Sequence, residues 1–254
     1  MDKKIPLGKF DFHVHTIHSN CGKAGMTPSA ALGMYSEAGY RALGFTDHFD
    51  PVLSPEKIRQ TKEELSEYDA GDIEYYIGVE ASTYLPDWPR RELSRMKEKH
   101  LDFCILSPSH RPSSSEAPAF SRLPVEIQAR KILDAFIEAV RTEFADAIAH
   151  PFAYGASQIP DRDRVLSEIH DSDLSWALEL AGRNGIAMEL SPRVLGIGEE
   201  FLSRFIGLCK EEGLMFSIGG DVHAPQSIGN DGLVHPILSK YSISEEKIWF
   251  PERR

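Results

Sequence analysis

The sequence has few cysteines and no long apolar run. Its three cysteines (Cys21, Cys104 and Cys209) are scattered through 254 residues and show no CxxC spacing, which argues against a disulfide framework and favours a reducing compartment. No stretch approaches the roughly 20 apolar residues that span a bilayer. The first ten residues hold no apolar run of the kind a signal segment needs. We therefore expect a soluble, cytoplasmic protein with no membrane partner.

Positive charge is also scarce. Lysine and arginine number 28 against 39 aspartate and glutamate residues, a formal net charge of −11. Such a surface repels nucleic acid and anionic membranes in general, so long nucleic acid is not an expected partner. A small anionic ligand at a locally neutralised site stays compatible with this charge. The composition is otherwise that of an ordinary globular domain, and it does not reveal the oligomeric state.

Short apolar runs alternate with longer helical patterns, which predicts repeated βα units. The expected strands are Phe10–Val14, Ala42–Thr46, Tyr75–Val79, Phe103–Leu106, Ala147–Ala149, Ala187–Leu190 and Met215–Ile218, with Lys247–Phe250 as a candidate extra strand. Helix starts are expected at Thr27-Pro28 and Ser54-Pro55, each an N-cap followed by proline. Further helices are expected over Pro124–Ala145, Leu174–Ala181 and Glu200–Cys209. An open doubly wound sheet and a closed barrel both fit this pattern.

Every expected strand ends in a residue that can bind a metal ion. These residues are His13 and His15, Asp47 and His48, Glu80, His110, His150, Glu189, and Asp221 and His223. The carboxyl ends of the strands of a parallel barrel open onto one face, where residues distant in sequence meet. The i, i+2 pairs place both side chains on one side of an extended chain. Because imidazole and carboxylate are ligands of Zn²⁺, Mn²⁺ and Fe, the pattern predicts a metal site in a barrel.

Some polar residues near the strand ends have more than one interpretation. Glu189 either orients a ligand histidine or lies outside the site. Arg111 directly follows His110, and Arg193 follows Glu189 by four residues; each is a candidate catalytic residue that grips phosphate, or a surface residue. The segment Pro112–Pro124 is either a lid over the site or an ordinary surface loop.

The ordered motifs resemble those of the PHP family, named after polymerase and histidinol phosphatase. They are His13-Val14-His15-Thr16, Thr46-Asp47-His48, Gly78-Val79-Glu80, Ser109-His110, Ala149-His150-Pro151 and Gly220-Asp221-Val222-His223. The resemblance spans nearly the whole chain. It implies an α/β fold, a distorted TIM-like (β/α)7 barrel forming a single domain over residues 1–254, with two or three divalent metal ions (Zn, Mn or Fe) and phosphoesterase activity.

The resemblance also implies which residues bind each ion. The first ion would take His13, His15, Glu80 and Asp221; the second would share Glu80 and take His110 and His150; the third would take His48, His223 and a ligand from the first loop. Members with three metals usually carry a histidine where this chain has Cys21, and many have aspartate in place of Asn20. A thiolate is a competent zinc ligand. Alternatively, Cys21 is only a small loop residue, and His18 or water completes the site.

Two ions that share a carboxylate would generate a metal-bound hydroxide and clamp the oxygens of a phosphoryl group. We therefore expect hydrolysis of a small-molecule phosphomonoester, with histidinol phosphate as a candidate. A third ion at His48 and His223 would neutralise further charge; without it, either histidine would act as general acid. The alternatives are a phosphodiesterase or exonuclease acting on short nucleotides, a catalytically silent metal-binding module, and amide hydrolysis at the same site.

Overall fold

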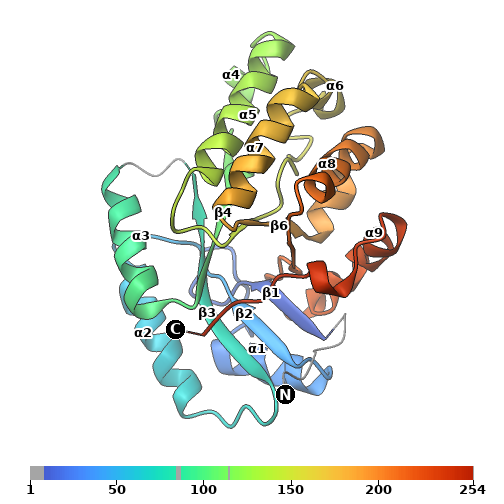
Figure 1. Cartoon of the computed structure of the whole chain (residues 1–254). Helices are drawn as coiled ribbons and strands as arrows, with labels where there is room; N and C mark the ends of the chain where they lie inside the picture. The colour runs from blue at the N-terminus through green and yellow to red at the C-terminus, as the bar shows by residue number, and fades with distance from the viewer. Residues whose placement is uncertain (1–8, 84–86, 114, 254) are drawn as a thin grey trace.

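Seven parallel strands, paired in chain order, form the centre of the molecule (Figure 1). This computed structural model describes residues 9–83, 87–113 and 115–253, with only the backbone for residues 87–89. The first eight residues, where no signal segment is expected, lie outside this description. The strands are β1 (Phe10–Val14), β2 (Ala42–Phe45), β3 (Glu74–Ser82), β4 (Phe103–Ser107), β5 (Ala147–Ile148), β6 (Ala187–Leu190) and β7 (Phe216–Ile218).

A parallel bridge between Val14 and Val222 joins the end of β1 to the chain just beyond β7. His15 N donates to Val222 O at 2.8 Å, and Val222 N donates to His13 O at 3.2 Å. These bonds bring the two outer strands together, so the sheet curls into a nearly closed barrel. Of the two architectures that the βα pattern allowed, the barrel is confirmed.

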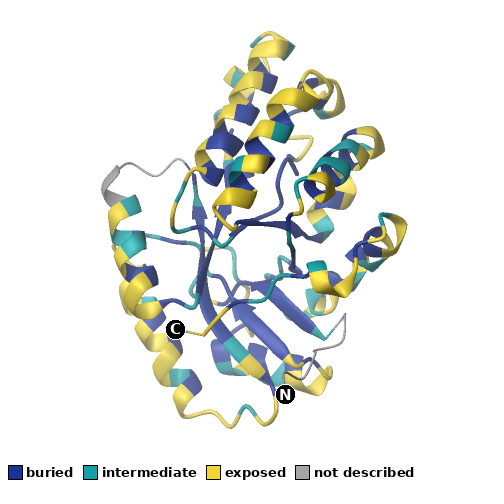
Figure 2. Ribbon diagram, viewed as in Figure 1, coloured by how far each residue is buried: buried dark blue, intermediate teal, exposed yellow. Residues whose placement is uncertain are grey.

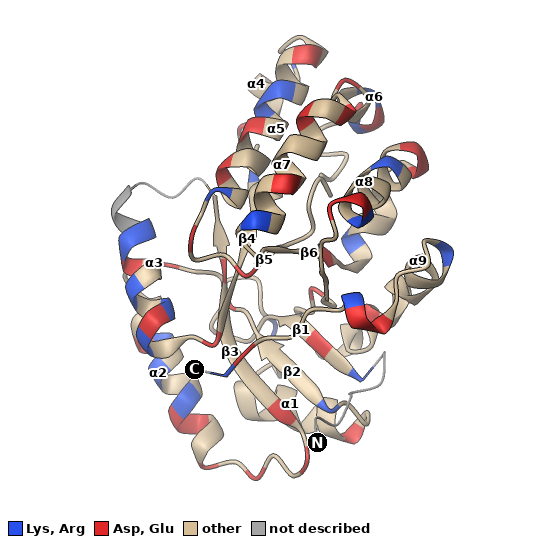
Figure 3. Cartoon of the chain, viewed as in Figure 1, with Lys and Arg blue, Asp and Glu red and all other residues tan. Residues whose placement is uncertain are grey.

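Helices surround the barrel (Figure 1). The α-helices are α1 (Pro28–Glu37), α2 (Ser54–Ser66), α3 (Asp87–His100), α4 (Ala117–Phe120), α5 (Val125–Val140), α6 (Arg162–Ser167), α7 (Asp171–Arg183), α8 (Glu199–Glu211) and α9 (His235–Lys240). The 3₁₀-helices are η1 (Pro108–His110), η2 (Pro192–Gly196), η3 (Pro225–Ser227), η4 (Asn230–Val234) and η5 (Glu245–Lys247). The strands are buried, and the outward faces of the helices are exposed (Figure 2) and carry most of the charge (Figure 3). Within the described residues, no helix is both long and apolar enough to cross a membrane.

The seven expected strands are all present, with small differences at their ends, but the extra strand expected at Lys247–Phe250 is wrong. Lys247 belongs to η5, and Ile248 makes one isolated bridge with Phe216. The ladder stops there, because Pro251 has no N–H to continue it. Trp249 and Phe250 instead pack their rings against Phe10, Phe12 and Phe103.

Two expected helix ends also need correction. Thr27 caps α1 as expected, accepting from Ala30 N at 3.2 Å. Ser54, however, is the first residue of α2 and not its cap; Asp50 takes over this end by accepting from the N–H groups of Val52 and Leu53. Helix α5 ends at Val140 and not at Ala145, as the amide of Asn184 bonds the Val140 carbonyl.

A buried ion pair ties the helical layer to the strands at Lys97, in α3. Its ammonium group donates to Asp146 at 2.8 Å and to the Phe144 carbonyl at 2.7 Å. Asp146 also accepts from Cys104 N at 2.7 Å, at the beginning of β4. The Lys97 side chain is 7% exposed, so it depends on Asp146 for its counter-charge.

We expect Asp146→Asn to lower the free energy of unfolding by about 3 kcal/mol, because a buried ammonium group would lose its partner. Urea denaturation measures this difference. Asp134→Asn is the matched control: Asp134 pairs with Arg130 on the exposed face of α5, and exposed pairs contribute little. Equal stability of the two variants would show that the Lys97–Asp146 pair does not hold the barrel.

Candidate metal centre

Glu80, near the end of β3, lies at the centre of a cluster of histidines. Its Oε2 atom is 3.5 Å from His13 Nε2, 3.4 Å from His15 Nε2 and 2.9 Å from His48 Nδ1. Its Oε1 atom is 3.3 Å from His110 Nε2 and 2.9 Å from His150 Nε2. The two oxygens of one carboxylate thus face two different groups of imidazoles, which is the arrangement of a carboxylate shared by two ions.

Asp221 faces the same cluster from beyond β7. Its Oδ1 atom lies 3.4 Å from both His13 Nε2 and His15 Nε2. Three groups of side chains have ligand atoms within 4.8 Å of one another at this centre: His13, His15 and Glu80; His13, His150 and Asp221; and His48, Glu80 and His110. The structure therefore brings together all the residues that the resemblance assigned to the first two ions.

The hydrogen-bond partners of His13 and His15 indicate that this centre suits a cation. His13 Nδ1 is 2.6 Å from Glu189 Oε1 and donates to it. Ser19 Oγ gives its only hydrogen to Asp47, so His15 Nδ1 must donate to Ser19 at 3.2 Å. The Nε2 atoms of both rings are left 3.1 Å apart. Two imidazole lone pairs repel at that distance unless a cation lies between or beside them.

The pKa shifts show how the side chains supply a positive charge here without a metal ion. Burial acts to lower the pKa of His13, but the charges of Glu189 and Glu80 outweigh it and raise the pKa well above its usual value. Burial lowers the pKa of His15 to about 4. Burial would raise the pKa of Glu80, yet the nearby His110 and His13 hold it well below its usual range. A proton on His13 fills the place that a divalent ion would take with two carboxylates and neutral imidazoles.

Glu189 lies within this cluster, against the ring of His13, which fits the first of its two sequence interpretations. It is buried, accepts from His13 Nδ1, and its Oε2 accepts from the backbone N–H of His150 at 2.7 Å. A Cβ atom at Gly219 would lie 2.5 Å from Glu189 Oε1, so only glycine fits beside it. A carboxylate on the far nitrogen fixes the tautomer and direction of a ligand imidazole.

Serines hold other members of the cluster in place, a role that no sequence motif indicated. Ser109 Oγ is 2.6 Å from His150 Nδ1, and Ser107 donates to Glu80. Ser19 holds His15, as described above. The only signal in the sequence is that these serines lie close to strand ends.

Two candidate ligands have a left-handed backbone conformation, which residues other than glycine rarely adopt. The φ angle is 31° at His150 and 50° at Asp221. Each such position costs on the order of 1–3 kcal/mol, and such strain collects at functional sites. At His150 the bond to Glu189 helps to hold the strained conformation.

A second group of possible ligands lies beside the buried centre. Ligand atoms of His15, Cys21, His48 and His223 are all within 4.8 Å of one another. His223 Nδ1 donates to the Asp221 carbonyl at 2.8 Å. The lone pair of this ring is therefore on Nε2, the nitrogen that could bind an ion. Burial acts to raise the pKa of the Cys21 thiol, but hydrogen bonds with His223 and His48 outweigh it and lower the pKa to about 6.

The two candidate arginines differ in their partners. Arg193, in η2, forms an ion pair with Asp221, and 44% of its side chain is exposed. Arg111 forms an ion pair with Glu116, whose carboxylate also accepts from Ser113 N. Arg193 therefore lies at the metal cluster, whereas Arg111 contacts the segment that follows it.

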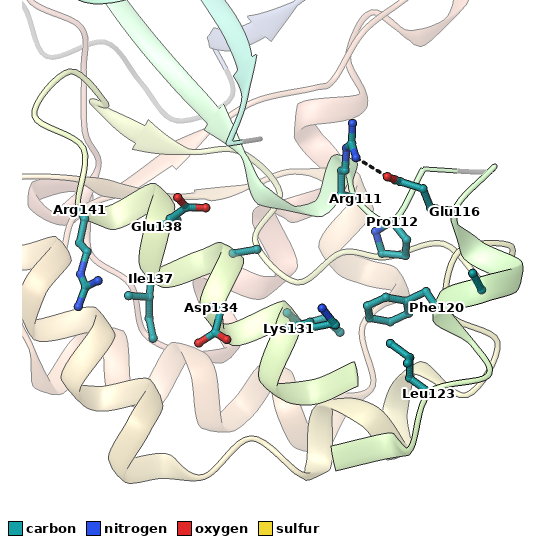
Figure 4. A pocket seen from close by; sticks show the side chains of 13 residues that line it. Arg111, Pro112, Glu116, Phe120, Leu123, Lys131, Asp134, Ile137, Glu138 and Arg141 are labelled. Carbon is teal, nitrogen blue, oxygen red and sulfur yellow. Dashed lines mark hydrogen bonds and ion pairs between the residues drawn. The ribbon is translucent and has the colours of Figure 1, made fainter. Parts of the chain in front are cut away.

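The segment Pro112–Pro124 is folded against α5, and its residue Ser114 lies outside the described residues. It contains α4, and with α5 it borders a cavity of about 660 Å³ (Figure 4). The Arg111–Glu116 pair lies at one end of this cavity and Arg141 at the other. None of the candidate ligands lines the described part of its wall.

Comparisons with known proteins agree with this barrel and its cluster. Residues 11–193 match the PHP domain. The chain belongs to the PHP domain family. The match includes the ligand candidates from His13 to His150 and ends at Arg193, before Asp221 and His223. No curated protein matches this sequence.

Among solved structures, the fold is similar to a Listeria monocytogenes protein provisionally assigned as the histidinol phosphatase HisK. The TM-score is 0.63 at 14% sequence identity, and the match covers 89% of this chain and all of that one. At this identity the similarity concerns the fold. It confirms the PHP-type barrel expected from the sequence.

We expect Glu189→Gln to weaken metal binding at the buried centre by about 10- to 100-fold, the usual effect of losing a carboxylate behind a ligand histidine. The amide cannot accept from both His13 and His150 N. Competition with a chelating dye measures the affinity. Glu179→Gln, on the exposed face of α7, is the control. Unchanged affinity in Glu189→Gln would refute its positioning role.

Proposed function

We propose that this protein is a metal-dependent phosphoesterase that hydrolyses a small phosphomonoester. The observation that carries the proposal is the geometry of Glu80, each of whose oxygens faces a separate group of histidines. One ion would take His13, His15, Glu80 and Asp221. A second would share Glu80 and take His110 and His150. When bound, such a pair of ions activates water near neutral pH and neutralises charge on a phosphoryl group.

The protein's own residues would orient the reacting groups. Glu189 and Ser19 hold the imidazoles of His13 and His15 in the ligand tautomer. Once Asp221 is engaged by an ion, the guanidinium group of Arg193 is available to bind a phosphate oxygen. A planar guanidinium suits such an oxygen because it offers several donors in one plane.

His48 and His223 lie on the solvent side, with side chains 37% and 24% exposed. Burial acts to lower the pKa of His48, but hydrogen bonds with Cys21 and Glu80 outweigh it and raise the pKa to about 10. If no ion binds between these two histidines, a protonated His48 can give its proton to the leaving oxygen of the substrate.

The substrate is a small molecule in this proposal, with histidinol phosphate as one candidate. The net charge of −11 disfavours long nucleic acid, since the affinity of proteins for it comes largely from lysine and arginine on phosphates. The fold similarity to the Listeria protein, which is provisionally assigned as a histidinol phosphatase, supports the choice of this candidate.

A panel of esters tests the reaction. The protein is purified without chelators, its metal content is measured, and anomalous scattering locates the ions. Histidinol phosphate, sugar phosphates and nucleotide monophosphates are then compared with a phosphate bis-ester. Phosphate release from monoesters supports the proposal; cleavage of only the bis-ester would indicate a phosphodiesterase. Bound metal without hydrolysis of any ester would indicate a binding module.

We expect Asp221→Asn to lose bound metal and to lower turnover by about 100-fold or more, as it removes an anionic ligand. Metal analysis and phosphate release are measured on the same samples. Asp72→Asn is the matched control, since the Asp72 side chain is 93% exposed. Full activity in Asp221→Asn would count against the ligand assignment.

We expect Arg193→Met to raise KM for the phosphomonoester about 10-fold or more while metal content stays the same, because one charged hydrogen bond to phosphate is lost. Arg111→Met, which breaks the ion pair with Glu116, should change KM much less. Steady-state kinetics compare the two variants. An unchanged KM in Arg193→Met would remove Arg193 from the phosphate site.

A further inference from the structure

The first loop places the thiol of Cys21 among imidazoles, and this thiol differs from the other two. Cys104 and Cys209 are completely buried, whereas Cys21 is partly exposed. Ligand atoms of His15, Cys21, His48 and His223 lie within 4.8 Å of one another. The feature is therefore a set of converging ligands from the first loop and from beyond the ends of three strands, β1, β2 and β7.

Local hydrogen bonds fix the loop in this position. Asp47, beyond β2, accepts from Thr16 N at 2.7 Å and from Ser19 Oγ at 2.8 Å. Lys23 N donates to the His223 carbonyl at 2.9 Å, which ties the other side of the loop to the end of β7. A Cβ atom at Gly22 would lie 1.8 Å from the Thr16 carbonyl oxygen. Only glycine permits this close turn, directly after Cys21.

Two members of the set, His15 and His48, also contact the buried centre. His48 Nδ1 lies 2.9 Å from Glu80 Oε2, and a proton on this nitrogen would leave the Nε2 lone pair for another ion. His15 donates from Nδ1 to Ser19, and its Nε2 lies 3.4 Å from both Glu80 and Asp221. A single lone pair serves a single ion, so Cys21, His48 and His223 remain as ligands for another. His18, the alternative first-loop ligand, is in none of the ligand groups formed by the described residues.

We propose that Cys21 makes the third metal position of this chain, which it would form with His48 and His223, a thiolate-bearing site that selects zinc over magnesium and manganese. Thiolate favours zinc, whereas carboxylate and water suit magnesium and manganese. Three protein ligands leave one position open, as in catalytic and not structural zinc sites. The proposal deepens the proposed phosphoesterase function and rests on it only for the neighbouring ions. It gives the partly exposed edge of the cluster a metal specificity different from that of the buried centre.

Cobalt(II) reconstitution tests the site through absorption spectra, independently of turnover. A cysteine ligand gives a thiolate-to-cobalt charge-transfer band in the near ultraviolet. We expect this band in the wild-type protein. Cys21→Ser should lose the band and one equivalent of tightly bound cobalt. Cys21→His should recover that equivalent without the band, since imidazole replaces thiolate as the ligand.

The possible outcomes separate this proposal from the proposed function. Persistence of the band in Cys21→Ser would overturn the thiolate site. Cobalt bound without any such band in the wild-type protein would also overturn it, while leaving the buried centre and the phosphoesterase proposal intact. A protein that binds no cobalt at all would refute both.

Alkylation of Cys21 is the second readout. Iodoacetamide reacts with free thiolate, and peptide mass spectrometry follows the modification at Cys21. At zinc one hundred times above the Kd of the site, about 1% of the thiolate is free, so alkylation should slow about 100-fold. Magnesium at the same concentration should not protect. Equal rates with and without zinc would overturn the proposal.

Discussion

The parallel bridge between Val14 and Val222 is the contact on which the metal centre depends. It joins the first strand to the chain beyond the last, and both valines are completely buried. Side chains alternate along extended backbone, so Val14 faces away from the cluster while His13 and His15 face inward. On either side of Val222, Asp221 and His223 also face the cluster, Asp221 through its left-handed backbone. Those four neighbours are candidate ligands. Closing the barrel and assembling one end of the site are therefore the same structural event, achieved by two backbone hydrogen bonds.

The second constraint is charge. Glu80, Asp221 and Glu189 bring carboxylates to a largely buried cluster, and burying charge is costly unless it is paired. The surrounding imidazoles already have their directions fixed, by Glu189 for His13 and by Ser109 for His150. Little reorganisation is needed to exchange the proton at His13 for a metal ion. The strained backbone at His150 and Asp221 belongs to the same preorganisation.

The sequence predicted the seven strands because buried parallel strands are short, nearly continuous apolar runs. It predicted the convergence of the ligands because a parallel barrel brings all carboxyl ends to one face. It failed at Lys247–Phe250, where apolar character signals burial but not pairing. The sequence suggested Glu189 as a partner of a ligand histidine, but it gave no sign of the serine partners. Ser109 precedes His110 in the chain yet bonds His150, 41 residues away, and no local pattern encodes such a contact.

The candidate ligands differ in exposure, and this difference determines the side from which a substrate can approach the site. His13, His15 and His150 are completely buried, whereas His48 and His110 are partly exposed. In the proposed reaction, a phosphoryl group can approach only from the exposed side, and its organic part must then remain outside the cluster. The loops that follow the strands would therefore contact the part of the substrate that distinguishes one ester from another. Because loops have no hydrophobic periodicity, the sequence predicts which residues converge at this site but not the contacts that would select its substrate.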